Sequence, residues 1–239
     1  PTSESPLSKV KSAKPTAAAP MGVRALSARA TREKILKAAT QVFAKHGYQG
    51  GSVEKISRAA NSVDRMIYYY FGSKEGLFTE VIEGIYRRMN EAEARLSLHV
   101  DDPVIALKQV IDFVLGYYRA NPEFITLLNT ENLLLGRHIA KSPRVAQYSS
   151  PAVGVIADIL DRGRAQHIFR SDLQARQVYL LIVSTGYFLM SNRYTLSAFL
   201  GERVDTADNA RAWKDFVTDA LLRTVLGPSV GTRGINTPM

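Results

Sequence analysis

Apolar side chains recur every three or four residues along almost the whole chain after Ser27, and no stretch alternates cleanly between apolar and polar positions. This spacing is typical of α-helices that bury one face, whereas a two-residue alternation would indicate strands. The sequence therefore predicts an all-α protein. The expected helices cover residues 28–46, two short stretches between 52 and 71, and then 73–98, 103–118, 121–138, 143–165 (bent by Pro151), 172–200 and 208–226.

The segment 52–74 carries the most specific pattern, two short helices joined by a tight turn and followed by the start of a third. Ser52 and Ser73 are good N-caps, and Asn61 stands where the chain must reverse, because Asn tolerates left-handed backbone better than most residues. The residues expected to face inward are Ile56, Ala59 and Ala60 in the first helix and Val63, Ile67 and Phe71 in the second. This order is that of a helix-turn-helix, which places one helix in the major groove of DNA.

Positive charge is concentrated around this motif. The chain has 31 Lys and Arg against 22 Asp and Glu, a net charge of +9. Residues 1–75 hold 13 basic and 5 acidic residues, a net of +8, and the remaining residues hold 18 and 17, a net of +1. Clustered positive charge releases counterions from the phosphate backbone of DNA. The charge distribution therefore favours nucleic-acid binding over a basic tail that only aids solubility.

The same distribution divides the chain into four parts. Residues 1–27 are expected to form a disordered basic extension, which either contacts DNA or is simply flexible. Residues 28–75 form the predicted three-helix helix-turn-helix domain, and residues 76–227 form a larger, nearly neutral helical domain. Residues 228–239 are expected to be a loose tail.

Composition argues against several other classes of protein. The chain has no Cys, so it offers neither disulfides nor a thiolate metal site, which suits a cytoplasmic location. The longest apolar run, 178–190, is too short to span a bilayer, and residues 1–30 lack the apolar core of a signal peptide. No phosphate-binding, nucleophile or metalloprotease motif is present, and the four histidines are widely separated. We therefore predict no enzyme activity, no cofactor, no metal site and no membrane partner.

The last two long helices are apolar on more than one side. Leu180, Leu181, Val183, Tyr187 and Phe188 cannot all face one small core. A helix that is apolar nearly all round is either central in its own domain or shared with a second subunit. The pattern favours a homodimer in which the helices near 173–199 and 208–226 pair as a four-helix bundle, the alternative being a self-contained monomer.

Four motifs resemble one family. Residues 31–86 are similar to the DNA-binding domain of the TetR (tetracycline-repressor-like) transcriptional regulators, through T-R-E-K-I-L-K-A-A (31–39), F-A-K-H-G-Y (43–48), I-S-R-A-A (56–60) and I-Y-Y-Y-F-G-S-K-E-G-L-F (67–78). The last motif is the most specific of the four. The resemblance implies a helical ligand-binding and dimerisation domain after the helix-turn-helix, but the residues after 86 carry no motif of comparable strength.

Two departures from the family pattern change the expected contacts. The turn reads Asn61-Ser62-Val63 in place of the usual Gly-Val-Ser, so the hydroxyl lies one position earlier and Ser62 is expected to cap the recognition helix. Met66 stands where the family often has Thr, and Tyr70 where it often has His. Base recognition at these two positions is therefore expected to be apolar, for instance against a thymine methyl group.

The resemblance also suggests a set of DNA contacts. Arg65 would read guanine, since its guanidinium can bond O6 and N7 together, with Asp64 orienting it or rejecting wrong bases. The phosphate contacts implied are Ser52 and Lys55 in the second helix, Tyr68 and Tyr69 in the recognition helix, and Lys74 beside the N-terminus of the fourth helix. The alternatives are that the tyrosines pack within the domain and that Arg65 is a solvated charge.

The family resemblance further implies a small-molecule effector that binds in the larger domain and changes the spacing of two recognition helices. The candidate ligand-binding residues place polar or aromatic groups on apolar helices: Phe113, Tyr117, Asn129, Asn132, Arg137, Tyr187 and Asn192. The polar neighbourhood of Glu131, Arg137 and His138 suggests a site for a carboxylate-bearing effector.

Together these features predict a DNA-binding transcriptional regulator, most simply a repressor, that binds double-stranded DNA at a palindromic operator as a dimer and is released or modulated by a small molecule. The alternative is a non-specific architectural DNA-binding protein. The large, nearly neutral domain after residue 76 argues against it, since such proteins seldom need one.

Overall fold

The computed structural model describes residues 22–95, 101–144 and 152–227. Within these ranges the regular secondary structure is helical, with one isolated antiparallel bridge between Phe169 and Leu226. The helices are α1 (Val23–Gly50), α2 (Val53–Ala59), α3 (Asp64–Phe71), α4 (Lys74–Glu93), α5 (Pro103–Ala120), α6 (Pro122–Leu133), α7 (Arg137–Ala140), α8 (Ala152–Ala165), α9 (Ala175–Ser191), α10 (Arg193–Leu200) and α11 (Ala207–Val225). The all-α prediction is confirmed.

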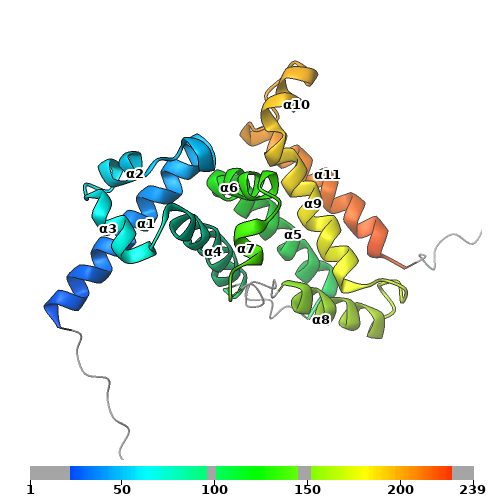
Figure 1. The fold of residues 1–239 in the computed structure, drawn as a ribbon. Helices are drawn as coiled ribbons and strands as arrows, with labels where there is room; N and C mark the ends of the chain where they lie inside the picture. Colours follow the sequence, from blue (N-terminus) through cyan, green and yellow to red (C-terminus); the bar gives the residue numbers. More distant parts are fainter. Residues whose placement is uncertain (1–21, 96–100, 145–151, 228–239) are drawn as a thin grey trace, which may run out of the picture.

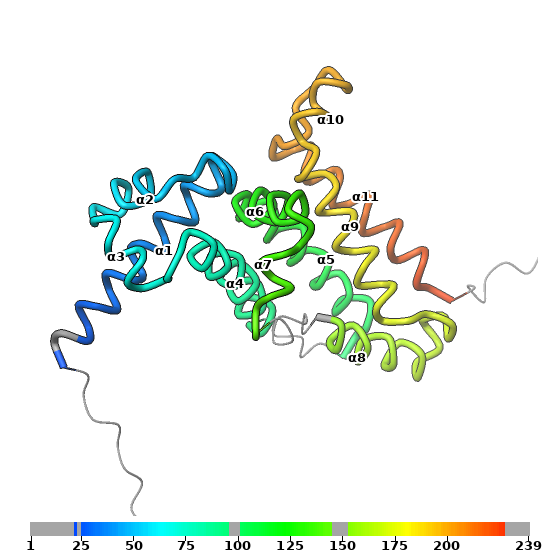
Figure 2. Tube along the Cα trace, in the orientation of Figure 1, coloured from blue at the N-terminus to red at the C-terminus, as the bar shows by residue number. Residues whose placement is uncertain are grey.

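The helices form a small N-terminal unit and a larger body. α1, α2 and α3 lie together at one end of the molecule, α4 runs from this unit toward the body, and α5 to α11 form the rest (Figure 1). α9 and α11 lie side by side on the side of the body remote from α1, and α10 extends beyond the end of α9 (Figure 2). In the described part of the chain, no helix combines the length and the apolarity needed to cross a membrane.

Three helices begin at a side-chain cap, and the sequence predicts the first two of these caps. Ser52 Oγ accepts a hydrogen bond from the Lys55 amide at 3.3 Å, and Ser73 Oγ accepts one from the Gly76 amide at 3.0 Å. The Asp102 carboxylate accepts from the amides of Val104 and Ile105 at 2.8 and 3.2 Å. Each cap satisfies backbone donors that have no partner inside the helix. The predicted caps at Ser52 and Ser73 are confirmed.

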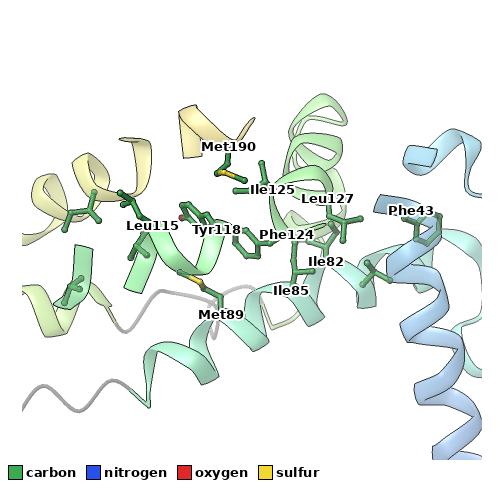
Figure 3. Packing of buried hydrophobic residues seen from close by; sticks show 14 of the residues in the cluster. Phe43, Ile82, Ile85, Met89, Leu115, Tyr118, Phe124, Ile125, Leu127 and Met190 are labelled. Carbon is green, nitrogen blue, oxygen red and sulfur yellow. The ribbon is translucent and has the colours of Figure 1, made fainter. Parts of the chain in front are cut away.

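One apolar core connects the small unit to the body. The Phe43 ring of α1 meets the Phe78 ring of α4 edge-on at 5.0 Å between centroids, and further along α4 the Tyr86 ring meets Phe124 of α6 at 6.0 Å. Figure 3 shows the buried side chains continuing from Phe43 past Ile82 to Tyr118. α4 therefore packs against both the small unit and the body.

The first helix begins earlier than predicted, at Val23 instead of Ala28, and its regular part ends at Gly47 as expected. Gly47 adopts φ +66°, a backbone conformation that glycine reaches without strain. Residues 1–21 and 228–239, predicted as extension and tail, lie outside the described residues. Residues 96–100, which include the predicted end of the helix after Ser73, also lie outside the described residues. The same holds for residues 145–151, which include Pro151, and the next helix begins at Ala152.

The prediction of one continuous helix over 172–200 is wrong, because the structure has two helices, α9 and α10, in this range. The first begins at Ala175, and the helical run is interrupted at Asn192, where both the amide and the side-chain Nδ2 donate to the Phe188 carbonyl, at 3.1 and 2.9 Å. An Asn side chain that bonds the backbone competes with the helical pattern. The apolar spacing runs through this break, which is why the sequence pattern does not reveal it.

The predicted helix over 121–138 is also divided. α6 ends at Leu133, Leu135 and Gly136 take left-handed backbone angles (φ +60° and +67°), and a new short helix starts at Arg137.

Two residues of the helix-turn-helix that were expected to face inward are exposed instead. Val63 is 58% exposed because it is the N-cap of α3 and lies outside the helical periodicity, and Ala59 lies on the outer face of α2.

Candidate nucleic-acid interface

The turn between α2 and α3 is fixed by local hydrogen bonds. Asn61 adopts φ +46°, as predicted, and the Ser62 amide donates to the Ser57 carbonyl at 2.9 Å. The buried hydroxyl of Ser57 donates to the Asp64 carboxylate, which joins α2 to the first turn of α3. The angle between the two helices is therefore set by groups inside the motif.

Two expectations about this turn are wrong. Ser62 does not cap the recognition helix: the N-cap position belongs to Val63, which has no side-chain hydrogen bond to the helix. The Asp64 carboxylate accepts from Ser57 and forms no ion pair with Arg65 among the described residues, so of its two expected roles the orientation of Arg65 is wrong, and the rejection of wrong bases stays a prediction. The displaced hydroxyl of the Asn-Ser-Val turn thus has no structural role in capping α3, and the acidic residue after it holds α2 and α3 together.

The outer face of α3 presents the side chains predicted to contact DNA. Arg65, Tyr68 and Tyr69 are all exposed, Tyr69 by 76%, while Ile67 and Phe71 are buried on the opposite side. Within the described residues Arg65 takes part in no ion pair, so its guanidinium is available to a ligand outside the chain. A guanidinium and two phenol hydroxyls on one helix face match the donors that read guanine and phosphate.

Met66 and Tyr70 lie at the sides of this face. Both are half-buried and pack against the core, and the Tyr70 ring meets the Tyr69 ring edge-on at 5.0 Å between centroids. The Tyr70 ring therefore supports the Tyr69 ring. Part of the Tyr70 surface stays exposed to solvent. If α3 lies in a DNA groove, the exposed surfaces of Met66 and Tyr70 can make apolar contacts with the bases.

Three further candidates flank α3. The Ser52 hydroxyl oxygen accepts from the Lys55 amide, and a hydrogen bond from the same hydroxyl lowers the pKa of the Glu54 carboxyl. Lys55 Nζ donates to the Gly50 carbonyl at 2.9 Å. Lys74 Nζ lies 4.7 Å above the Tyr48 ring and donates to the Gln49 carbonyl at 3.4 Å. Partial burial lowers the pKa of Lys74, with nearby Glu54 opposing the shift. The Lys74 ammonium thus already has a cation–π contact with Tyr48, whereas the Lys55 side chain is exposed to solvent.

Tyr48 is a residue whose role the sequence analysis missed. Its ring lies 4.9 Å from Phe78, 5.1 Å from His138 and 6.1 Å from Phe43, between centroids. The guanidinium of Arg137, a candidate ligand residue, lies 5.8 Å from the same ring and so belongs to this junction. The only sequence signal is that Tyr48 ends the F-A-K-H-G-Y motif, directly after the helix-ending glycine.

A cavity of about 580 Å³ lies in the body, between α4, α5, α6, α8 and α9. Its walls are rich in aromatic and polar side chains: Tyr86, Met89, Asn90, Glu93, Tyr118, Phe124, Leu128, Asn132, Val153, Arg176, Tyr179, Leu180, Val183, Ser184 and Tyr187. Burial raises the pKa of Tyr86 and Tyr118 further above neutral pH, and both phenols line the cavity as neutral hydroxyl groups. The volume falls in the range of sites for small organic ligands.

Two of the seven predicted ligand residues, Asn132 and Tyr187, line this cavity. Asn129 lies behind the wall, where its Oδ1 accepts from the Tyr187 hydroxyl and from Ser191 Oγ at 3.1 Å. The other four, Phe113, Tyr117, Arg137 and Asn192, lie outside the lining. The lining residues Tyr86, Tyr118 and Tyr179 were missed because they occupy inward positions of amphipathic helices, where the pattern alone predicts core packing.

The polar neighbourhood of Glu131 and His138 has an internal explanation. The Glu131 carboxylate accepts from the amides of His138 and Ile139 at 2.7 and 3.0 Å and contacts His138 Nδ1 at 2.7 Å. Both side chains are buried. The polar groups at this place thus bond to one another within the chain, and a carboxylate-bearing effector beside them stays a prediction. Among the described residues no group of three acidic or His side chains could hold a metal ion.

Comparison with known proteins extends these observations. Residues 35–81 match the family model described as "Bacterial regulatory proteins, tetR family", and residues 103–221 match "Tetracyclin repressor-like, C-terminal domain". The HTH-type transcriptional repressor NicS of Pseudomonas putida is 50% identical over 204 residues, which cover 84% of this chain and 95% of NicS. The HTH-type transcriptional repressor SCO4008 of Streptomyces coelicolor is 28% identical over 155 residues, or 65% of this chain and 76% of that protein.

Solved structures share the fold at low sequence identity. The ketosteroid transcriptional regulator KstR2 of Mycobacterium tuberculosis superposes with a TM-score of 0.61 at 18% identity, over 82% of this chain and 95% of that one. The fatty acid degradation regulator FadR from Bacillus halodurans gives a TM-score of 0.60 at 21% identity, over 80% and 93%. At these identities the similarity concerns the fold alone.

Proposed function

The chain belongs to the TetR family of transcriptional regulators, and we propose that it represses transcription as a dimer that binds a palindromic operator through α3 and is released by a small molecule bound in the body. It is a DNA-binding regulator and not an enzyme. The observation that carries the operator proposal is the exposed face of α3, where Arg65, Tyr68 and Tyr69 stand on a helix tied to α2 through Ser57 and Asp64.

Two copies are needed to read two half-sites. α9 and α11 expose large apolar side chains, among them Leu181, Phe188 and Phe216, on the outside of the body. Pairing of these helices with their symmetry mates removes that surface from water and sets a fixed distance between two α3 helices. A two-fold dimer matches an inverted repeat because each α3 then meets the same base sequence.

The cavity is the proposed effector site. Tyr86, Met89, Asn90 and Glu93, all from the C-terminal half of α4, form one wall. The same helix begins at Lys74, three residues after the last residue of α3. A ligand that prefers one position of α4 therefore favours one spacing of the two recognition helices by its differential affinity.

Selection of bound sequences from a random pool of duplex DNA tests the operator proposal. The expected result is enrichment of one inverted repeat, with protection of both half-sites in a footprint. Uniform recovery of unrelated sequences would instead identify a non-specific architectural protein. Once an operator is known, small organic compounds can be titrated into the protein–operator complex, and release by a compound that no longer acts after substitution of Tyr187 would support the cavity as the effector site.

A further inference from the structure

α10 is a short helix with no buried residue. Tyr194, Phe199 and Leu200 are all exposed, Phe199 by 84%, and the helix extends away from the body (Figure 1). Helices shorter than about 12 residues are marginal in water unless an apolar face is packed. An eight-residue helix that shows three large apolar side chains to solvent lacks such a packing partner in its own protomer.

The return of the chain after α10 is nevertheless held by specific hydrogen bonds. Ser197 Oγ donates to the Arg193 carbonyl at 2.6 Å and accepts from the Val204 amide at 3.1 Å. Asn209 Nδ2 of α11 donates to the Arg203 carbonyl at 2.7 Å. These bonds fix α10 relative to the start of α11, so its apolar side chains are presented in one geometry instead of sampling many.

Beside α10 lies an open apolar groove of about 460 Å³, which α9, α10 and α11 form together. Its walls include Phe188, Leu200, Val204, Trp213 and Phe216. Phe188 and Phe216 also belong to the exposed apolar face of α9 and α11. The groove is thus continuous with the surface through which the dimer is proposed to form.

We propose that α10 is a dimer arm: Phe199 of each protomer inserts into this groove, against Trp213 of the partner subunit and Phe216 of the partner subunit. A two-fold contact is self-complementary, so one ridge and one groove on the same chain satisfy each other twice. Phe199 is exposed and is not among the residues that line the groove of its own protomer, so its ring is available to a second copy. The arm rests on the proposed dimer through α9 and α11 and extends its interface.

Crosslinking tests the arm directly, because the chain contains no Cys. Phe199→Cys and Phe216→Cys proteins of different tag lengths are prepared separately, mixed under subunit exchange and treated with a short bismaleimide. The expected product is a crosslinked species containing one chain of each kind. Mixing Leu135→Cys, a site 92% exposed on the α6–α7 connection, with Phe216→Cys is the matched control and should give none. No mixed product, or efficient crosslinking of Phe199→Cys to itself alone, would overturn the arm.

Sedimentation velocity over a dilution series separates failure of the arm from failure of the dimer. Phe199→Ser is expected to raise the dimer dissociation constant about ten-fold or more, as loss of a buried interface aromatic does, while Leu135→Ser leaves it unchanged. If Phe199→Ser dimerises like the unmodified chain while Leu181→Asp dissociates, the α9 interface stands and the arm is wrong. A chain that is monomeric throughout the series would overturn the dimer and the arm together.

Discussion

The carboxylate of Glu131 lies 2.7 Å from Nδ1 of His138, and the two buried side chains link the end of α6 to the start of α7. The same carboxylate caps α7 through the amides of His138 and Ile139. The imidazole then packs on the rings of Tyr48 and Phe78, 5.1 and 4.8 Å away between centroids. One acidic side chain of the body thus positions the imidazole that contacts the DNA-binding unit.

Glu131→Ala is expected to lower the free energy of unfolding by about 3–5 kcal/mol, because it leaves a buried imidazole and two amides without their acceptor. Urea denaturation followed by circular dichroism measures the change. The control is Asp219→Ala, which removes an exposed ion pair with Arg223 and should cost less than about 1 kcal/mol. Equal losses for the two variants would show that the Glu131–His138 pair has no special role in stability.

Gly76→Ala is expected to destabilise the DNA-binding unit by about 1–3 kcal/mol through overpacking. A Cβ at this position would lie 2.2 Å from the Phe71 carbonyl oxygen, and backbone atoms at the end of α3 cannot move aside without shifting the recognition helix. Gly116→Ala in α5 is the matched control. Nothing lies within 4 Å of its Cβ, so it should stabilise the chain by about 0.5–1 kcal/mol. Opposite signs in urea unfolding are the decisive result, and a neutral Gly76→Ala would contradict the contact.

The features that the sequence predicted well are those decided within a few residues. The caps at Ser52 and Ser73 depend on a side chain and an amide three positions away. The reversal at Asn61 and the exposure of Arg65, Tyr68 and Tyr69 follow from local turn chemistry and helical period. Such interactions do not require knowledge of how distant helices cross.

The features that it did not predict depend on tertiary contacts. The division of the helix over 121–138 comes from the Glu131 carboxylate, which captures amides seven and eight residues later. The cavity is made by residues of five helices, so whether an inward tyrosine lines space or fills the core depends on crossing geometry. Asn129 is an example. Its polar side chain on an apolar helix suggested a ligand contact, but its side-chain oxygen accepts hydrogen bonds from Tyr187 and Ser191.

Arg65→Ala is expected to weaken operator binding by about 1–3 kcal/mol and to relax one base preference, because a bidentate contact to guanine carries both affinity and discrimination. Gel-shift titrations on the selected operator and on single-base variants measure both quantities. Lys108→Ala, which removes an exposed positive charge from α5 in the body, is the control for net charge and should leave both unchanged. Unaltered affinity together with unaltered base preference in the Arg65 variant would remove this side chain from the interface.

Lys55→Ala is expected to weaken binding to all duplexes by a similar factor and to leave base preference unchanged. Lys55 is exposed at the start of α2, and its ammonium has a neutral carbonyl, that of Gly50, as its hydrogen-bond partner at 2.9 Å. A lysine in this position contributes charge to the phosphate backbone without reading bases. Each phosphate contact releases about one counterion, so the slope of log affinity against log salt should become shallower by about 1.

The two substitutions therefore separate the two kinds of contact, since Arg65→Ala changes the ranking of sequences while Lys55→Ala changes the salt dependence. Fluorescence anisotropy at four or more salt concentrations, on the operator and on a scrambled duplex, gives both slopes. A Lys55 variant whose slope equals that of the unmodified protein would mean that α2 does not approach the phosphates. In that case α3 would have to enter the groove at an angle that lifts α2 away from the backbone.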